Sequence, residues 1–582
     1  MKVLTAWWAP IVVGVVVYAV HNLSFQPWTL DDAYITFRYA DNFAAGLGPV
    51  YNEGERVEGY TTFLWMAMLA ASSAAGLSAV WVAKVYGILA SMATLVLVTT
   101  AHRIVPSISP KLAWYAGLLV ATNPILTRWS MSGMEVPLVM LLTTAGLLVH
   151  LRERAADEAS PKTAALVGLI CVLAAMTRPD AGLLFGVLGL DRLRSVILRR
   201  PRALGAMLIF AAVFAVLFGS FFAWRYSYYG WLLPNTFYVK VGATSAQVLR
   251  GVYYLNTFLI VSCCYGAALA AALLPVRIPP LPLVLASSLL FAANIAYIYV
   301  NGGGPFIAVG YAYAGLALAA LNLTTFRMAP GLIVGAALAA LHTVYVVAVG
   351  GDIMYGYRFF VAVLPIMALL IASAVVTAEA GRPLRRLLFW APLVLNIGWM
   401  VTSIELNAPG RVSERGIAVG HFLREHAPAD AIVAVNVAGT IPYYSGLRAI
   451  DTLGLNDEHI AHIEVEDMGA GWAGHEKGDG DYVLSRGPDY VIFASAHGSK
   501  KPRFRGDHEL FDSVDFQDAY DLHRYPLQTS AGDDFDFTVW VRRADHGGRG
   551  LGAAVPDRVA TGDLRSTLPP REERTDPTAT WW

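Results

Sequence analysis

The sequence predicts a mainly α-helical polytopic membrane protein that carries a C-terminal extracytoplasmic α/β domain. Three observations predict this class. Of the 582 residues, 56% are hydrophobic and 15% are charged, whereas soluble domains carry about a quarter charged residues. Apolar stretches recur from residue 5 to residue 404. After residue 404, charged residues become more frequent and short runs of β-branched residues appear, which is typical of a small α/β domain.

The apolar stretches predict about 11–13 transmembrane helices, because several are shorter than the ~20 residues of a full span. They cover residues 5–22, 62–78, 81–99, 112–127, 134–150, 164–177, 180–190, 203–223, 254–274, 281–300, 307–325, 331–349, 359–378 and 388–404. Thr177-Arg178-Pro179-Asp180 interrupts the pair 164–190, which fits one broken helix or two helices in a tight pair. The first stretch lacks a small-residue cleavage site, so we expect it to be retained as a span.

Basic loops predict the orientation, since cytoplasmic loops are enriched in lysine and arginine. Arginines cluster between residues 192 and 202 and again between 382 and 386. If both clusters are cytoplasmic, the loops at 225–253, 301–304 and 350–358 lie outside. An N-terminus inside would also place Asp31 and Asp32 outside. The loop with His102, Arg103 and Lys111 fits this alternation poorly.

The chain divides into three predicted parts. Residues 1–404 form the transmembrane domain, residues 405–545 the α/β domain, and residues 546–582 a flexible tail rich in proline and charge. In the middle part, a helical stretch at 416–426 precedes predicted strands at 431–435, 490–493 and 537–541.

The segment from Leu30 to Asn42 contains two adjacent carboxylates, Asp31 and Asp32, directly after the first span. It predicts a helix with Thr29 or Asp31 as N-cap and Gly46 as its stop. A charge at the membrane edge is costly unless it faces a cavity, a partner or headgroups. The pair therefore predicts a base, a nucleophile or a metal ligand. The alternative is that one Asp caps the helix and the other is solvated.

Further polar and aromatic residues gather in the loops that we place on the same outer side. The candidates are Arg38, Glu58, Tyr60, Glu135, Arg178, Asp180, Arg225, Asn235, Tyr238, Lys240, Asp352, Tyr355 and Arg358. Each alone is also explained by the preference of such side chains for membrane interfaces. Together they suit a sugar attached to a phosphate, because cations hold the phosphate and a carboxylate handles a hydroxyl proton.

Other features exclude some classes. A net charge of zero does not indicate nucleic-acid binding. The three cysteines, Cys171, Cys263 and Cys264, lack a metal-binding spacing. No pair of histidines on an apolar stretch has the i, i+4 spacing of a metal site. Gly302-Gly303-Gly304 lacks the Lys and Ser/Thr of a phosphate loop.

Several motifs resemble one family of membrane enzymes. They are residues 31–42, 46–52 and 57–62, Ser132-Gly133-Met134-Glu135, Thr177-Arg178-Pro179-Asp180, residues 234–240, Gly351-Asp352, Tyr357-Arg358-Phe359 and residues 451–457. Together they resemble the glycosyltransferases of the GT-C fold that use polyprenyl-phosphate sugars. Within that fold they are most similar to the actinobacterial terminal β-(1→2) arabinofuranosyltransferases. The resemblance extends to about residue 545.

The resemblance implies a function. It implies D-arabinofuranose transfer from decaprenyl-phosphoryl-arabinofuranose to the non-reducing ends of arabinogalactan or lipoarabinomannan, at the outer face of the plasma membrane. Asp31 and Asp32 would be catalytic, and Lys240, with Arg358, Arg225 or Arg38, would meet the lipid phosphate. Glu58, Tyr60, Glu135, Arg178, Asp180, Asn235, Tyr238, Asp352 and Tyr355 would line the substrate site, and the C-terminal domain would position carbohydrate.

Three questions stay open at this point. A β-linked donor giving a β-link implies net retention, by double displacement or by same-face attack. No motif requires a cofactor. Asp31 and Asp32 could bind a divalent cation, but no motif fixes a third acidic ligand. The alternative functions are a transporter or flippase of lipid-linked sugars and a GT-C transferase of another sugar.

Overall fold

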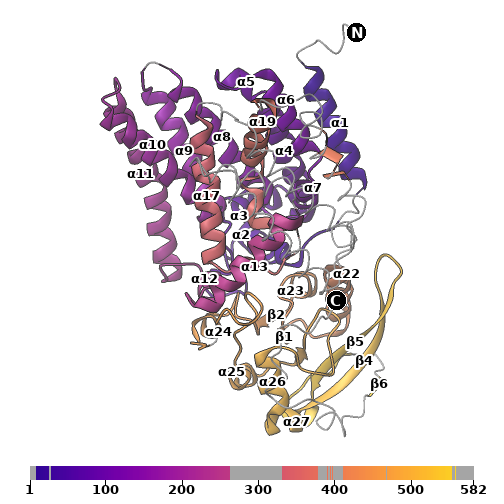
Figure 1. Ribbon diagram of the computed structural model, residues 1–582. Helices are drawn as coiled ribbons and strands as arrows, with labels where there is room; N and C mark the ends of the chain where they lie inside the picture. Colours follow the sequence, from indigo (N-terminus) through magenta and orange to yellow (C-terminus); the bar gives the residue numbers. More distant parts are fainter. Residues whose placement is uncertain are drawn as a thin grey trace.

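The computed structural model describes residues 8–24, 28–156, 158–261, 331–354, 356–377, 411–466, 468–552 and 557–558, with a few positions between 390 and 397. A helical domain forms one half of the molecule and a domain built on a β-sheet forms the other (Figure 1). Cys263, Cys264, the Gly302-Gly303-Gly304 loop, the arginines at 382–386 and Tyr355 lie outside the described residues.

The helical domain is a bundle of apolar helices with short polar elements at its ends. Its helices are α1 (Ala9–Ser24), α2 (Asp31–Ala44), α3 (Phe63–Ala74), α4 (Ala79–Thr99), α5 (Ala101–Ile104), α6 (Pro110–Ala121), α7 (Pro124–Ser130), α8 (Val136–Arg154), α9 (Pro161–Thr177), η2 (Pro179–Ala181), α10 (Gly182–Ile197), α11 (Ala203–Tyr229), α12 (Asn235–Lys240), α13 (Ser245–Val261), α17 (Leu332–Ala348), α18 (Arg358–Val361) and α19 (Leu364–Thr377).

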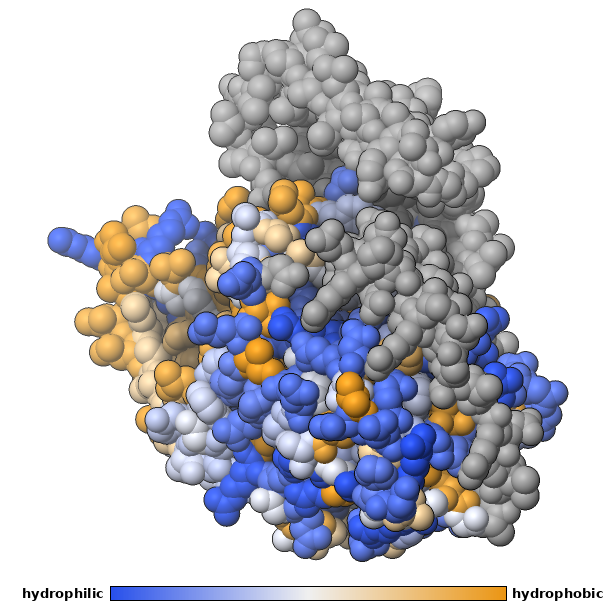
Figure 2. Space-filling view, turned by 90° about the horizontal axis from the view of Figure 1, so that it is seen from below, coloured by the Kyte–Doolittle hydropathy of each residue, from blue (hydrophilic) through white to orange (hydrophobic). Residues whose placement is uncertain are grey.

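Three of these described helices, α4, α8 and α11, are long and apolar enough to cross a membrane, judged by length and composition. On α11 the large side chains Leu204, Leu208 and Val216 are 59%, 60% and 63% exposed. A helix that exposes so much apolar surface needs lipid around it, because water would penalise that surface. Figure 2 shows hydrophobic side chains at the left, where Figure 1 places α10 and α11, and a largely hydrophilic surface over the sheet domain.

The interrupted segment 164–190 forms two helices in a tight pair. Helix α9 ends at Thr177, and η2 turns the chain before α10 begins. At the other end of the pair, the Ala159 amide donates to the Pro201 carbonyl at 3.1 Å. The start of α9 and the end of α10 are therefore neighbours, so the two helices are antiparallel. Proline at the first position of η2 explains the break, since it ends the hydrogen bonding of the preceding helix.

Helix α2 forms as expected, but its capping differs from the prediction. Leu30 is the N-cap residue and makes no side-chain cap, while Asp31 is the first helical residue. The prediction of Thr29 or Asp31 as N-cap is therefore wrong, because the Asp31 carboxylate is engaged by another part of the chain. Gly46, at φ +83°, lies just after the helix as predicted.

The C-terminal domain is a six-stranded mixed sheet flanked by helices. Its strands are β1 (Ile432–Val435), β2 (Arg448–Asp451), β3 (Tyr490–Ile492), β4 (Tyr520–Gln528), β5 (Asp534–Arg542) and β6 (Asp557–Arg558), in the order β2-β1-β3-β5-β4-β6. Strand β1 is parallel to β2 and β3, and the other pairings are antiparallel. Its helices are α22 (Arg411–His426), α23 (Thr440–Ser445), α24 (Glu458–His462), α25 (Gly480–Ser485), α26 (Arg505–Asp512) and α27 (Val514–Ala519).

The predicted strands at 431–435, 490–493 and 537–541 correspond to β1, β3 and part of β5, while β2 and β4 were not foreseen. In β4 the adjacent polar residues His523 and Arg524 interrupt the alternation of a strand, and Pro526 follows them, which hid its strand character. Strand β6 pairs with β4 although it lies within 546–582, the predicted tail. Trp540 and Tyr490 are among the largest fully buried side chains of this domain.

Candidate active site

The two adjacent carboxylates at the start of α2 point to different partners, because neighbouring residues on a helix do not share a face. Asp31 faces the C-terminal domain. Its carboxylate accepts from the Gly439 amide at 3.0 Å, the Thr440 amide at 2.8 Å and the Thr440 hydroxyl at 2.6 Å. Burial raises the pKa of Asp31 to about 6, although these hydrogen bonds oppose the rise. Asp31 thus holds the start of α23 against α2.

Asp32 faces the helical domain and Arg358, the first residue of α18. Its Oδ2 lies 3.4 Å from Nη1 of Arg358, and its side chain is 23% exposed. Arg358 is held more closely by Asp352, with Nε 2.5 Å from Oδ2. In the described part of the chain, the Asp32 carboxylate therefore has one long ion-pair contact and some access to solvent, whereas Asp352 is only 7% exposed.

Lys240, the last residue of α12, lies beside this group. The charges of Arg358, Asp32 and Asp352 act on its ammonium, and burial lowers its pKa. Among the described residues, no carboxylate lies within ion-pair distance of Nζ, and the side chain donates no hydrogen bond there. We call Asp32, Lys240, Asp352 and Arg358 the charge cluster. Its least restrained members are one anion, Asp32, and one cation, Lys240.

Local backbone conformation fixes Arg358 in the charge cluster. Tyr357 adopts a left-handed conformation at φ +50° immediately before α18. Gly356, at φ +88°, approaches α7 so closely that an added Cβ would lie 3.1 Å from Nε1 of Trp129. That indole donates to the Gly356 carbonyl at 2.6 Å. Only glycine fits this position, since both the backbone angle and the close approach exclude a side chain.

A second set of predicted residues lies next to the charge cluster as a closed ion-pair network. Nη1 of Arg178 lies 2.9 Å from Glu135, and its Nε lies 2.9 Å from Asp180. The guanidinium also lies over the Phe359 ring at 5.1 Å. The Glu135 side chain is 1% exposed. This network supports the segment that carries Arg358, and its charges are already paired.

Glu58, Tyr60, Arg225 and Asn235 form a third set, which ties loops together. Glu58 receives two contacts from Nε of Arg225 at 2.9 and 2.7 Å. The Asn235 amide donates to the Glu58 carbonyl, and its side chain donates to three carbonyls of residues 454–457. Tyr60 hydrogen-bonds Tyr229 at 3.0 Å. These residues hold α11, α12 and the C-terminal domain together, and their polar groups have partners within the chain.

Two more predicted residues lie away from the charge cluster. Arg38 donates to the Tyr51 carbonyl at 2.7 Å, the Leu447 carbonyl at 2.8 Å and the Pro442 carbonyl. It thus joins α2 to the C-terminal domain and has no anion partner in the described part of the chain. Tyr238 contacts the imidazole of His462, with ring centres 4.4 Å apart. Tyr355 lies outside the described residues.

The sequence analysis did not identify the segment 468–478, which lies over the charge cluster. A Cβ on Gly474 would meet Cε of Lys240 at 3.1 Å. His475 lies within range of the charges of Asp32 and Lys240, and burial lowers its pKa to about 4, so it is neutral at pH 7. Thr440 was missed as well. The glycine-rich run around Trp472 and His475 is the sequence signal that could have identified this segment.

The described residues offer little for a metal shared between the two adjacent carboxylates. Both oxygens of the Asp31 carboxylate accept hydrogen bonds from Gly439 and Thr440, at the start of α23. A shared ion would require this carboxylate to turn away from them. In the described part of the chain, no group of three or more His, Cys, Asp and Glu side chains is arranged to hold a metal ion.

Comparison with known proteins identifies similar transferases. The chain is 27% identical over 371 residues to a terminal β-(1→2)-arabinofuranosyltransferase of Corynebacterium glutamicum, covering 60% of this chain and 48% of that protein. It is 29% identical over 243 residues to the protein of the same name in Mycobacterium tuberculosis, covering 40% and 38%. The matched region thus spans less than half the length of either relative.

Residues 405–541 match a family model described as a domain of unknown function, DUF8728. Among solved structures, the chain is similar to ArnT from Cupriavidus metallidurans bound to undecaprenyl phosphate, at a TM-score of 0.38 and 14% identity, covering 76% of this chain and 84% of that one. It is also similar to the oligosaccharyltransferase AglB from Archaeoglobus fulgidus, at a TM-score of 0.47 and 10% identity, covering 95% and 77%.

Proposed function

We propose that this protein is a membrane glycosyltransferase that moves D-arabinofuranose from decaprenyl-phosphoryl-arabinofuranose to the non-reducing ends of arabinan, forming terminal β-(1→2) links. The observation that carries the proposal is the charge cluster, in which Lys240 lacks a carboxylate partner among the described residues while Asp32 is partly exposed beside it. The two relatives that bear this activity in their names support the choice of sugar.

The cations of the charge cluster suit the phosphate of the donor. Lysine and arginine both form charge-assisted hydrogen bonds to phosphate oxygens. A phosphate beside Lys240 would give its ammonium the counter-charge that the described residues do not supply. It would also compensate the burial that lowers the pKa of Lys240. Arg358 would share this contact through Nη1, whose distance of 3.4 Å to Asp32 leaves it less tightly held than the Nε that Asp352 binds.

In this proposal Asp32 is the catalytic carboxylate and Asp31 is a positioning residue. Asp32 can accept the proton of an acceptor hydroxyl or approach the anomeric carbon, the choice depending on how net retention is achieved. Asp31 accepts three hydrogen bonds from residues 439–440. It would keep the C-terminal domain against α2 and so define one wall of the site. We further propose that no metal bridges the two carboxylates.

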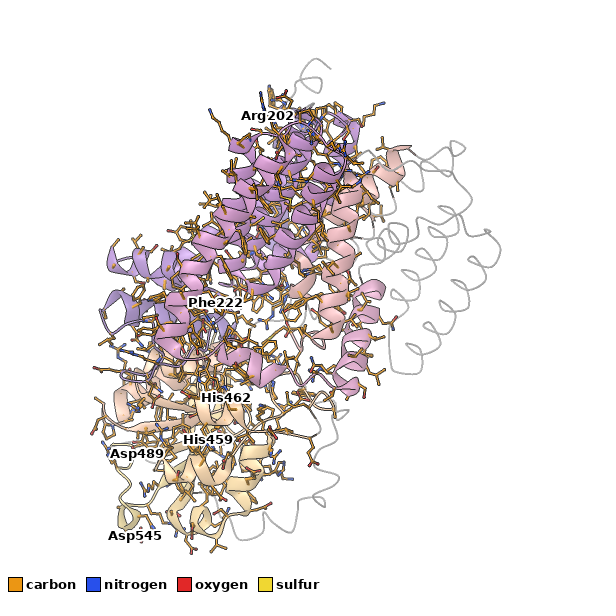
Figure 3. The ribbon with its side chains drawn as sticks, turned by 90° about the vertical axis from the view of Figure 1, so that its left-hand side faces the viewer. Arg202, Phe222, His459, His462, Asp489 and Asp545 are labelled. Atoms are coloured by element: carbon orange, nitrogen blue, oxygen red, sulfur yellow. The ribbon has the colours of Figure 1, made fainter. Side chains whose placement is uncertain are left out.

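The proposal places the charge cluster and the C-terminal domain on the extracytoplasmic side, where a polymer acceptor is accessible. Lys240 lies beyond the end of α11 that is next to the C-terminal domain, whereas Arg202 lies at the opposite end (Figure 3). A transporter of lipid-linked sugars is less well supported, because such proteins place their binding residues near the middle of the membrane.

The test is transfer by the purified protein in detergent from a synthetic polyprenyl-phosphoryl-arabinofuranose to a short arabinan, followed by mass spectrometry and linkage analysis. We expect the acceptor to gain single pentose units. A donor with the same lipid and a different sugar is the matched control. Transfer of the other sugar instead would support a different transferase. With the protein reconstituted into vesicles, movement of donor across the membrane without any transfer would support the transporter. Addition of a chelator should leave the rate unchanged.

A further inference from the structure

A groove at the junction of the two domains has features of a ligand site that are separate from the charge cluster. Its volume is about 640 Å³, and it is lined by the first loop at Glu55–Val57, by Trp231, by residues around α24, and by Tyr482 and Arg486. These segments are far apart in the sequence, so the groove exists only in the folded chain. Figure 3 shows His459 and His462, which lie on its α24 wall, at the boundary between the helices and the sheet domain.

Two aromatic stacks form the walls of this groove. Trp231 stacks on the imidazole of His462 with ring centres 3.9 Å apart and an angle of 26°. Tyr482 stacks on His459 at 4.1 Å and 22°. The two histidines are three residues apart on α24, so they project from the same face of that helix. The rings of Trp231 and Tyr482 are therefore presented by one short helix.

The Trp231 ring is held in place while much of it stays exposed. Its indole N–H lies 3.2 Å from Oε1 of Glu458, and 39% of the side chain is exposed. A rigid, exposed aromatic ring costs little entropy when a ligand stacks on it. This exposure is also unusual, because packing alone would bury an aromatic ring of this size. Such a ring suits the C–H face of a sugar.

The polar groups of the groove are already arranged and paired in charge. The Tyr482 hydroxyl donates to Asp457 at 3.0 Å and accepts from Arg486 at 2.7 Å. Arg486 also meets Glu55 at 2.9 Å. Because both signs are present and bound to each other, a strongly charged ligand would meet repulsion from one of them. A neutral polyhydroxyl ligand can use the remaining lone pairs and N–H groups without breaking these pairs.

The groove is coupled to the charge cluster by α12. Tyr238 of this helix contacts His462, and Lys240, two residues later, belongs to the charge cluster. The side chain of Asn235 binds the carbonyls of residues 454, 455 and 457, so α12 and the groove form one rigid unit. At 1.5 Å per residue the six-residue helix α12 is about 9 Å long. A length of a few sugar units at most therefore connects the groove to the charge cluster.

We propose that this groove binds the acceptor glycan at sugar residues preceding the end that is extended. The glycan is a neutral oligosaccharide, stacked on Trp231 and hydrogen-bonded by the paired polar groups. That the glycan is the acceptor rests on the proposed function. Saccharide binding in the groove does not itself require transfer to occur.

The test measures binding first, without donor. Arabinofuranose hexasaccharide and disaccharide are titrated into the full-length protein by calorimetry, for the wild type, Trp231→Leu, Tyr482→Leu and the control Tyr226→Leu. Tyr226 is 48% exposed on α11 and does not line the groove. We expect hexasaccharide affinity to fall roughly tenfold in each groove variant, as expected for the loss of one aromatic stacking contact, and to stay at wild-type level in the control.

Transfer kinetics then separate this inference from the proposed function. In Trp231→Leu, KM for the hexasaccharide should rise roughly tenfold, with a smaller change for the disaccharide. Unaltered hexasaccharide binding in both groove variants, or no binding by the wild type, would overturn the groove as a saccharide site. Binding that is lost in the groove variants, in a protein that transfers no sugar, would support the groove and reject the proposed function.

Discussion

Buried charges gather at both ends of the helical domain, and the two groups differ in how completely they are paired. At the end near Arg202, Arg192 and Glu153 meet at 2.6 Å, and their side chains are 5% and 3% exposed. Asp191 there receives His150 at 2.9 Å and Arg154 at 3.1 Å. At the end near the C-terminal domain, Asp32 has one ion-pair contact among the described residues, at 3.4 Å, and its side chain is 23% exposed.

This difference distinguishes a structural use of charge from a chemical one. A buried charge that loses its partner strongly destabilises a protein, so the paired charges near Arg202 hold α8 and α10 together. A charge with a long contact and solvent access can exchange its partner for a substrate. Groups of the second kind are candidates for chemistry, because their protonation and binding can respond to a ligand.

The largest expected effect is at the open end. Asp32→Asn removes the negative charge and keeps the shape of the side chain, so the protein should fold normally and lose transfer by roughly 100-fold or more, the range for a general acid or base. The measurement is the rate from a polyprenyl-phosphate donor together with the melting temperature. A wild-type transfer rate in this variant would show that the Asp32 carboxylate, although loosely paired with Arg358, takes no part in catalysis.

At the closed end, Glu153→Gln should act on stability instead. Removing the partner of buried Arg192 should cost about 3–5 kcal/mol, seen as a lower melting temperature in detergent. The variant that remains folded should keep the wild-type KM for donor, since Glu153 is far from the charge cluster. A raised donor KM at unchanged stability would contradict the distinction between the two ends.

Lys240→Met tests the cation that has no carboxylate partner among the described residues. A charge-assisted hydrogen bond contributes about 1.5–3 kcal/mol, so KM for the donor should rise roughly 10- to 100-fold and KM for the acceptor should change little. Lys240→Arg, which keeps the charge, is the matched control and should retain more of the donor affinity. Equal changes in both KM values would mean that Lys240 shapes the site without binding phosphate.

The smallest effect concerns Asp31 and is seen as a dependence on pH. Burial raises the pKa of Asp31 to about 6 in the folded protein, above its ordinary value near 4. The folded state therefore binds more protons than the unfolded state between about pH 4 and 6, and this contribution to stability falls as pH rises through that window. The fall should be about 1–3 kcal/mol.

Asp31→Asn cannot ionise, so its stability should be less dependent on pH across the same window. The difference between the wild-type and variant curves isolates Asp31 from other groups whose pKa is also raised, such as Asp507. Parallel curves would show that Asp31 stays ionised in the folded protein. Thr440→Val removes one hydrogen bond to the Asp31 carboxylate, so it should raise the folded-state pKa of Asp31 and with it the upper end of this window.

Much of the architecture could be predicted, because it depends on local composition. Apolar runs predicted the helices, Pro179 predicted the break between α9 and α10, and β-branched runs predicted β1 and β3. Strand β4 was missed because the adjacent polar residues His523 and Arg524 interrupt its alternation and Pro526 follows, although it pairs with the next strand, β5, in a hairpin. The predicted N-cap of α2 was wrong because the Asp31 carboxylate has hydrogen-bond partners 408 and 409 residues away.

The candidate site shows the same limit more sharply. The sequence identified which residue types are unusual in an apolar chain, and Asp32, Lys240, Asp352 and Arg358 were all among them. It could not distinguish these from Arg38, Arg225 or Glu58, whose charged groups form hydrogen bonds and ion pairs within the chain. Nor did it identify Thr440, which has no local signal, or His475, which only the glycine-rich run around it marks.

The sequence by itself therefore determined that the protein lies in a membrane, that an α/β domain follows, and that an acidic pair stands at the exit of the first helix. These depend on hydrophobicity and periodicity, which are properties of neighbouring residues. Long-range packing determined which of the two carboxylates is engaged by α23 and which faces Arg358, and it also built the groove beside Trp231. The direction of a side chain depends on what the rest of the chain places next to it, and burial and charge there follow from that neighbour.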